Sequence, residues 1–256
     1  MLFTRTAFLG IEPSSGRRPL AFAALDDDLN LLALGLGSRD AVLAYAAGLD
    51  SAIVAVNGPR RAAQGWLARE EFRASLQPVP KPGRWDGWRV AEYEIRLRGI
   101  KAARTAYAGE AAGGAMGVFG ALDQLGFTGF PAAPSTIPEG ARFSIEVYPH
   151  GAFTALLGRV PFPRNSLEGR IQRQLVLYIN QVNVPNPMSV FEEITRHRLL
   201  QGILPLEMLH TPAELDALVG AFTARFAART PDAVRLGHPA EGEIVFPVRQ
   251  LPAHFS

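Results

Sequence analysis

The stretch "FLGIEPSSGRRPLAFAALDDD", residues 8–28, holds two apolar runs separated by a turn and ends in three aspartates. Each run has the length and composition of a strand, and Pro13 and Gly16 break the chain between them. We therefore expect strands over residues 6–12 and 19–25. The first strand ends on a single acid, Glu12. Such an acid most often marks the point where a strand reaches water. The alternative is that Glu12 is one of several side chains that form a functional site.

The following residues extend this pattern into a sheet. The segment "DDDLNLLALGL" predicts a third strand, with its aspartates in a hydrated turn rather than a metal cluster. A helix is expected over residues 38–49, because Ser38 can cap its start and Gly48 its end. The apolar strand in "SAIVAVNGPRR" is typical of the middle of a sheet covered on both faces. A similar strand, "ARFSIEVYPHGAF", carries Glu146 near its end.

The remainder of the chain reads mainly as helices. They are expected over residues 90–105, 113–125, 166–183 and 189–201, and "GEIVFPV" predicts a late strand. The helix near the C-terminus has the clearest signals, since Thr211 and Glu214 form a capping box. This order of elements predicts one mixed-sheet α/β domain over residues 1–256, with a basic loop and helix insertion at about 60–105.

Composition narrows the classes of protein. The chain has 256 residues, 48% of them hydrophobic, which is ordinary for a globular protein. It has no cysteine, so disulfides, thiolate metal sites and cysteine nucleophiles are excluded, and a cytoplasmic location is expected. The sequence contains no run of about 18 apolar residues, so no membrane-spanning helix is expected. Arg5 and Glu12 bracket only six residues, too few for the apolar segment of a signal peptide. The oligomeric state is left open.

The net charge of +2 hides an uneven distribution. Residues 60–104 contain 11 basic and five acidic side chains, a local excess of six positive charges. A concentrated basic stretch favours a phosphate-bearing partner such as nucleic acid. A solvated, arginine-rich insertion would look the same, and nearly all basic residues here are arginines, as a GC-rich genome alone would produce.

Three acids occupy similar places in the predicted fold. Glu12 and Glu146 stand at strand ends, and Asp216 lies on the flank of the apolar stripe of the C-terminal helix. Like charges held close together in a low dielectric repel, so converging carboxylates need a cation. Hard oxygen ligands suit Mg²⁺ or Mn²⁺, and such ions can promote phosphodiester cleavage. The chain has no P-loop, HExxH or GxSxG motif that would favour another mechanism.

Five segments resemble, in order, those of the domain of unknown function family 429: "FLGIEPSSGRRPLAFAALD", "IVAVNGPRR", "EYEIRLRGI", "FSIEVYPHGAF" and "ELDALVGAFTA". Members of that family are predicted nucleases with a ribonuclease H-like fold. The resemblance therefore implies a mixed five-stranded sheet, its first three strands antiparallel, flanked by helices. It also implies an acidic centre built from the first strand, the fourth strand, the "EVYP" element and the last helix.

Matched residue by residue, the resemblance implies catalytic roles for Glu12, Asn57, Glu146 and Asp216, with the three acids as ligands of Mg²⁺ or Mn²⁺. Two positions depart from the family pattern. Glu12 stands in place of the usual aspartate and is one methylene longer, and Asn57 replaces an aspartate before a proline. Asn57 offers an oxygen without a charge, which leaves a one-metal enzyme and an inactive relative as alternatives to two-metal catalysis.

Four arginines are candidate phosphate-binding residues. Arg60 and Arg61 directly follow the fourth predicted strand, and Arg17 and Arg18 lie in the first turn. Guanidinium groups bind phosphate oxygens well, although surface solubility explains these arginines equally well.

The leading functional hypothesis is a metal-dependent nuclease or phosphodiesterase of ribonuclease H-like fold that acts on nucleic acid. The second is a catalytically decayed nucleic-acid-binding module, motivated by the missing charge at Asn57. The third is a phosphotransferase related to the actin and sugar-kinase group, whose core shares this topology. That group normally repeats the fold in two lobes, and this chain has no internal repeat.

Overall fold

Strand β1 (Ala7–Glu12) lies in the middle of a mixed sheet and is buried from Ala7 to Ile11. The computed structural model describes residues 6–13, 19–102, 114–131, 137–204 and 206–255. In it, β1 pairs antiparallel with β2 (Leu20–Leu25) and parallel with β4 (Ala52–Asn57). A strand that is apolar on both faces requires cover on both faces, and helices supply it.

The remaining strands extend the sheet in the order β3-β2-β1-β4-β6-β8-β7, with β5 also beside β6. Their bounds are β3 Leu31–Gly37, β5 Thr128–Gly129, β6 Arg142–Val147, β7 Arg235–His238 and β8 Gly242–Val245. The first three strands are antiparallel, as expected, whereas β4, β6 and β8 run parallel to β1. The described sheet has eight strands, so the expected number of five is wrong. Strands as short as β5 and β7 carry too few residues for an alternating pattern to be recognised.

Eight α-helices and three short 3₁₀ helices occur in the described part of the chain. The α-helices are α1 Arg39–Ala47, α2 Glu70–Ala74, α3 Val90–Leu97, α4 Ala115–Gln124, α5 Pro149–Leu157, α6 Leu167–Ile179, α7 Glu193–Leu200 and α8 Pro212–Arg229. The 3₁₀ helices are η1 Trp66–Ala68, η2 Pro187–Phe191 and η3 Leu206–Met208. Ser38 caps α1, and the Thr211–Glu214 capping box begins α8, as predicted. Helix α3 ends earlier than expected, just before Gly99, whose φ is +79°.

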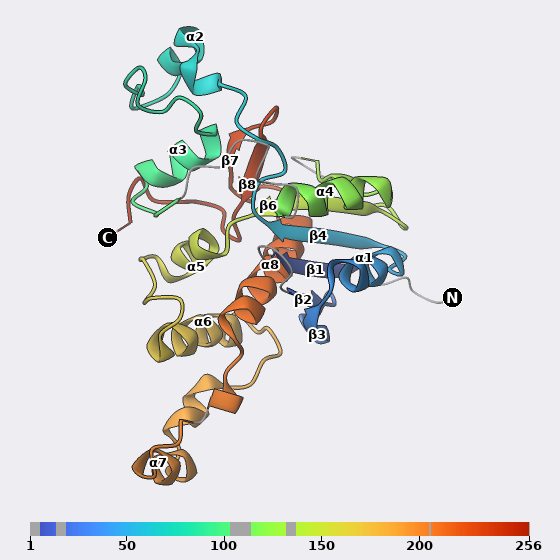
Figure 1. The fold of residues 1–256 in the computed structure, drawn as a ribbon, viewed down its shortest axis with the longest axis vertical. Helices are drawn as coiled ribbons and strands as arrows, with labels where there is room; N and C mark the ends of the chain where they lie inside the picture. Colours follow the sequence, from blue (N-terminus) through green and yellow to red (C-terminus); the bar gives the residue numbers. More distant parts are fainter. Residues whose placement is uncertain (1–5, 14–18, 103–113, 132–136, 205, 256) are drawn as a thin grey trace.

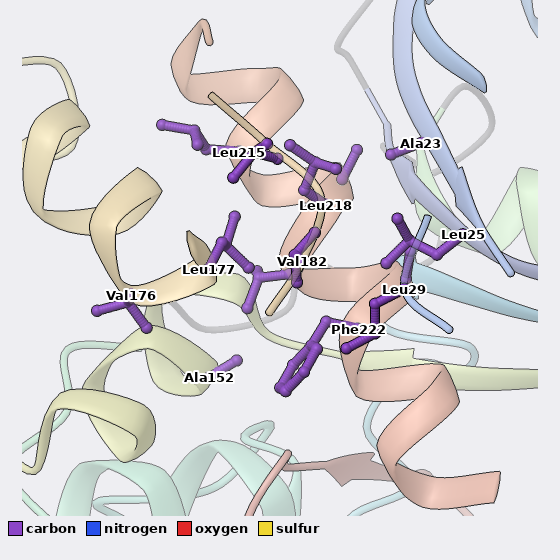
Figure 2. Close-up of a cluster of buried hydrophobic side chains, with 14 of the residues drawn as sticks. Ala23, Leu25, Leu29, Ala152, Val176, Leu177, Val182, Leu215, Leu218 and Phe222 are labelled. Carbon is purple, nitrogen blue, oxygen red and sulfur yellow. The ribbon is translucent and has the colours of Figure 1, made fainter. Parts of the chain in front are cut away.

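The helices cover opposite faces of the sheet. Helices α5, α6 and α8 share one hydrophobic cluster with β2, and α1 and α4 share another with β1 and β4 (Figure 1). Figure 2 shows the first cluster, in which Leu215, Leu218 and Phe222 of α8 project between α6 and the strands. None of the helices in the described part of the chain has the length and apolar character needed to cross a bilayer.

Helix α8 approaches β1 unusually closely. A Cβ atom at Gly10 would lie 1.9 Å from the carbonyl oxygen of Ala217 and 2.6 Å from the nitrogen of Ala221. A Cβ at Gly220 would lie 3.5 Å from the Cα of Gly10. Two glycines thus face each other where the helix crosses the strand, and this contact sets the distance between α8 and the sheet.

Substituting Gly10→Ala is expected to lower the free energy of unfolding by about 3 kcal/mol, the upper range for overpacking, because the obstructing atoms are backbone. Urea denaturation measures the change. Gly35→Ala in β3 is the matched control, since its Cβ would meet nothing nearer than 4.0 Å. Equal stability of the two variants would contradict the close crossing.

Candidate active site

Glu12 and Asn57 lie side by side at the carboxyl ends of two neighbouring parallel strands. Ile11 of β1 pairs with Val56 of β4, so the next residue of each strand emerges at the same edge. The Asn57 Nδ2 atom donates a hydrogen bond of 2.5 Å to Glu12 Oε2. The carboxyl edge of parallel strands is where open α/β sheets usually bind ligands.

Helix α8 brings Asp216 to the same point, and Arg164 joins the two acids. Arg164 lies in the connection between α5 and α6. Its Nε donates to Asp216 Oδ2 at 2.6 Å, and its Nη2 lies 3.8 Å from Glu12 Oε1. The structure thus brings Glu12, Asn57 and Asp216 together. Sequence reasoning missed Arg164, because it stands in an irregular segment with no motif.

The two acids are held in an environment that disfavours their charge. Burial, and then the nearby charge of Asp216, raises the pKa of Glu12 to about 8. Burial also raises the pKa of Asp216, against the opposing effect of Arg164. Arg164 and, for Asp216, Arg173 oppose the effect of burial without cancelling it. Glu12 is therefore largely protonated at neutral pH.

These groups line a cavity of about 480 Å³. Its wall also contains the cationic side chains of Lys101 and Arg173, together with His150. Arg173 is buried and donates to the carbonyl oxygens of Phe162 and Gly169. Burial, followed by the charges of Arg173 and Lys101, lowers the pKa of His150, so its imidazole is neutral near pH 7. The cavity thus combines two acids, three cations and a neutral imidazole.

Glu146 does not join this group. It faces the other side of the sheet, because Ile145 and Val147, its neighbours in β6, pack toward α8. Its carboxylate receives Arg89 Nη1 at 2.5 Å and Nη2 at 2.7 Å, and also the backbone N–H of Arg60. Burial raises the pKa of Glu146, whereas Arg89 lowers it. The expected convergence of three acids is therefore replaced by a pair of acids and a separate buried ion pair.

None of the predicted phosphate-binding arginines that the structure describes lies at the acid pair. The side chain of Arg60 donates to Ser144 Oγ at 2.7 Å and forms an ion pair with Asp123, on the face that holds Glu146. Arg61 donates to the carbonyl oxygen of Ala240. Arg17 and Arg18 lie outside the described residues.

Several arginines of the basic stretch make contacts within the protein. Arg69 lies 4.0 Å from the ring centre of Trp66, and Arg96 lies 5.1 Å from that of Trp88. Arg89 is fully buried against Glu146. An excess of arginine in a sequence can thus reflect internal cation–π and ion-pair contacts as much as a surface for a phosphate-bearing partner.

The donor set at the acid pair suits one hard divalent cation. Within the described residues, no cluster of three or more His, Cys, Asp or Glu side chains is arranged to hold a metal ion. Glu12 and Asp216 nevertheless supply two buried carboxyl groups, and Asn57 adds a neutral amide. Mg²⁺ is commonly held by one or two carboxylates together with water and phosphate oxygens. The residues fit one such ion and offer too few acids for two.

Comparison with known families identifies the relatives of the chain. A family model described as "Protein of unknown function (DUF429)" matches residues 40–241, which is most of the chain, and the protein therefore belongs to that family. Searches against curated proteins and against solved structures gave no significant match.

Without divalent cations, stability is expected to fall as the pH rises from about 4.5 to about 8. Folded Glu12 keeps its proton over this range, whereas the unfolded side chain releases it near 4.5. Glu12→Gln should remove a slope of up to about 1.4 kcal/mol per pH unit. Urea denaturation at several pH values measures this slope. The exposed control Glu70→Gln should retain the wild-type slope, and an unchanged slope in Glu12→Gln would contradict the assignment.

The Arg89–Glu146 pair is expected to be structural. Glu146→Leu or Arg89→Met alone should each lower the free energy of unfolding by about 3–5 kcal/mol, because each leaves a buried charge unpaired. The double variant should recover most of that loss in denaturation experiments. If Glu146→Leu instead abolished metal binding without a loss of stability, Glu146 would belong to the active site.

Proposed function

We propose that this member of the DUF429 family is a metal-dependent phosphodiesterase of ribonuclease H-like fold that acts on nucleic acid. One observation carries the proposal. Glu12 and Asp216, from a central strand and from the helix that crosses it, meet beside Asn57 in a cavity that also presents cationic side chains. Acids that bind a cation, next to cations that bind an anion, form a site suited to a phosphate ester with Mg²⁺ or Mn²⁺.

The sheet supports the fold assignment. The order β3-β2-β1-β4-β6, with three antiparallel strands followed by parallel ones, agrees with the sheet that the family resemblance implies. Strands β5, β7 and β8 then extend this core beyond β6. The acid pair stands at the carboxyl ends of the central strands, where the resemblance also places the catalytic centre.

We assign the side chains that line the cavity separate roles in the proposed reaction. Glu12 and Asp216 would hold one divalent cation, which supplies Lewis-acid stabilisation of the charge that develops on the phosphate. Arg164 would then leave the neutralised acids and, with Lys101, bind the phosphate oxygens. The neutral imidazole of His150 can accept a proton from an attacking water. Glu146 has no part in this scheme, because Arg89 occupies its carboxylate.

A binding module without catalysis is the second candidate, and Arg164 is the observation that favours it. Its guanidinium already contacts both acids, so the site has a resident positive charge of its own. Together with the neutral Asn57, this arrangement is also what a former metal centre would leave behind. The two proposals differ in whether a metal ion displaces Arg164.

The proposal predicts cleavage of single-stranded, duplex or hybrid nucleic acid that depends on Mg²⁺ or Mn²⁺. Glu12→Gln and Asp216→Asn should each lower the rate about 100-fold or more, while their folding is checked by circular dichroism. Activity should rise toward pH 8, because the cation must displace the Glu12 proton. Asp232→Asn, which alters an exposed ion pair with Arg249, is the matched control.

Two outcomes would count against the proposal. Wild-type protein that cleaves nothing with either metal, yet binds nucleic acid in a salt-sensitive manner, would favour the binding module. Cleavage that persists in Asp216→Asn would place the centre elsewhere. Arg164→Gln adds a direct comparison, since removal of the competing guanidinium should tighten Mn²⁺ binding if the metal displaces it.

A further inference from the structure

A second cavity, of about 270 Å³, opens where the sheet is interrupted along β6. One edge of β6 is paired with β4 over its full length. The other edge pairs with β5 at Phe143 and Ser144, and with β8 at Glu146 and Val147. Strands β5 and β8 therefore follow each other along the same edge, and the cavity lies at the junction between them.

Three arginines from two parts of the chain line this cavity. Arg60 and Arg61 follow β4, and Arg235 belongs to β7. Arg235 is mostly buried and donates to the carbonyl oxygens of Phe130 and Pro131. Burial lowers the pKa of Arg235, which marks an environment that disfavours a positive charge.

The positive charge of this cavity is incompletely offset. Arg60 pairs with Asp123, and of the two acids that line the cavity, Glu146 and Glu243, Glu146 is already bound by Arg89. Arg235 has one carboxylate nearby, Glu243, at 3.9 Å. Within the described residues, the buried Nε of Arg235 has no hydrogen-bond partner, and no carboxylate lies within 4 Å of the Arg61 guanidinium. An anion in the cavity would offset the exposed charge of Arg61.

We propose that this cavity binds the phosphate group of a small phosphorylated ligand. Guanidinium groups form charge-assisted, often bidentate bonds with phosphate oxygens, and a doubly charged group matches several arginines better than one carboxylate does. The volume holds a phosphate with a small substituent. This cavity shares no lining residue with the cavity that holds Glu12 and Asp216, so binding here is separate from the proposed reaction.

Isothermal titration calorimetry on the full chain tests the proposal, with inorganic phosphate and ribose 5-phosphate as probes and ribose as the neutral comparison. Phosphate and ribose 5-phosphate should bind and ribose should not. Tighter binding of ribose 5-phosphate than of inorganic phosphate would identify a phosphorylated metabolite as the ligand, and equal binding would identify the free anion. Failure of both anions to bind at millimolar concentration would overturn the proposal.

Variants of the lining residues test whether phosphate binds in this cavity. Arg61→Gln and Arg235→Gln should each weaken phosphate binding about tenfold or more. Arg61 is exposed, so its variant is expected to fold even if Arg235→Gln does not. Gly129→Val adds an independent test, because a Cβ there meets no atom within 4 Å and the side chain would enter open space at the cavity wall.

Two controls separate this cavity from other sites. Arg249→Gln removes an exposed arginine elsewhere and should leave the affinity for phosphate unchanged. Arg164→Gln alters the acid-pair cavity, and in metal-free buffer, where Arg164 is paired with Glu12 and Asp216, it should change the affinity less than twofold. If Arg164→Gln abolished binding while Arg61→Gln and Gly129→Val did not, phosphate would occupy the candidate active site and the proposal would be wrong.

Discussion

The crossing of α8 over β1 is the contact on which the candidate active site depends. Gly10 and Gly220 let the helix backbone approach the strand backbone directly. Asp216 stands one helical turn before Gly220, and Glu12 stands two residues after Gly10 on the same face of the strand. The glycine contact therefore fixes the separation of two acids that would otherwise repel. The packing of α8 against the sheet, together with the contacts of Arg164 to both side chains, holds the two acids together.

The buried acids on the two faces of the sheet differ in their ion pairs. On one face, Arg89 binds Glu146 with two hydrogen bonds, and the backbone N–H of Arg60 donates a third. On the other face, Glu12 and Asp216 share Arg164, and burial leaves the pKa of both raised. A fully paired acid contributes mainly to structure, whereas an incompletely offset pair retains the capacity to bind a cation or a proton. The pairing, and not the pKa, distinguishes Glu146 from the candidate site residue Glu12, since burial raises the pKa of both.

Local patterns predicted the central elements well. The antiparallel first strands, the apolar β4 and the capped helices α1 and α8 followed from turn residues, apolar runs and capping side chains. The additional strands β5 and β7 did not, because they are short and depend on tertiary pairing with β6 and β8. The basic stretch was recognised in the sequence by its excess of positive charge. Its arginine–tryptophan contacts became visible only in three dimensions.

The sequence by itself determined which residues end the central strands and which acid lies on the flank of α8, because these positions follow from chain order and helical periodicity. Only the tertiary structure decided which of them meet. In the register between β4 and β6, Asn57 stands opposite Val147 and Val56 opposite Glu146, so Glu146 points away from the face of Asn57. A shift of one residue would reverse that assignment. Arg164 likewise reaches the acids from an irregular segment, where no periodicity of the sequence indicates the direction of a side chain.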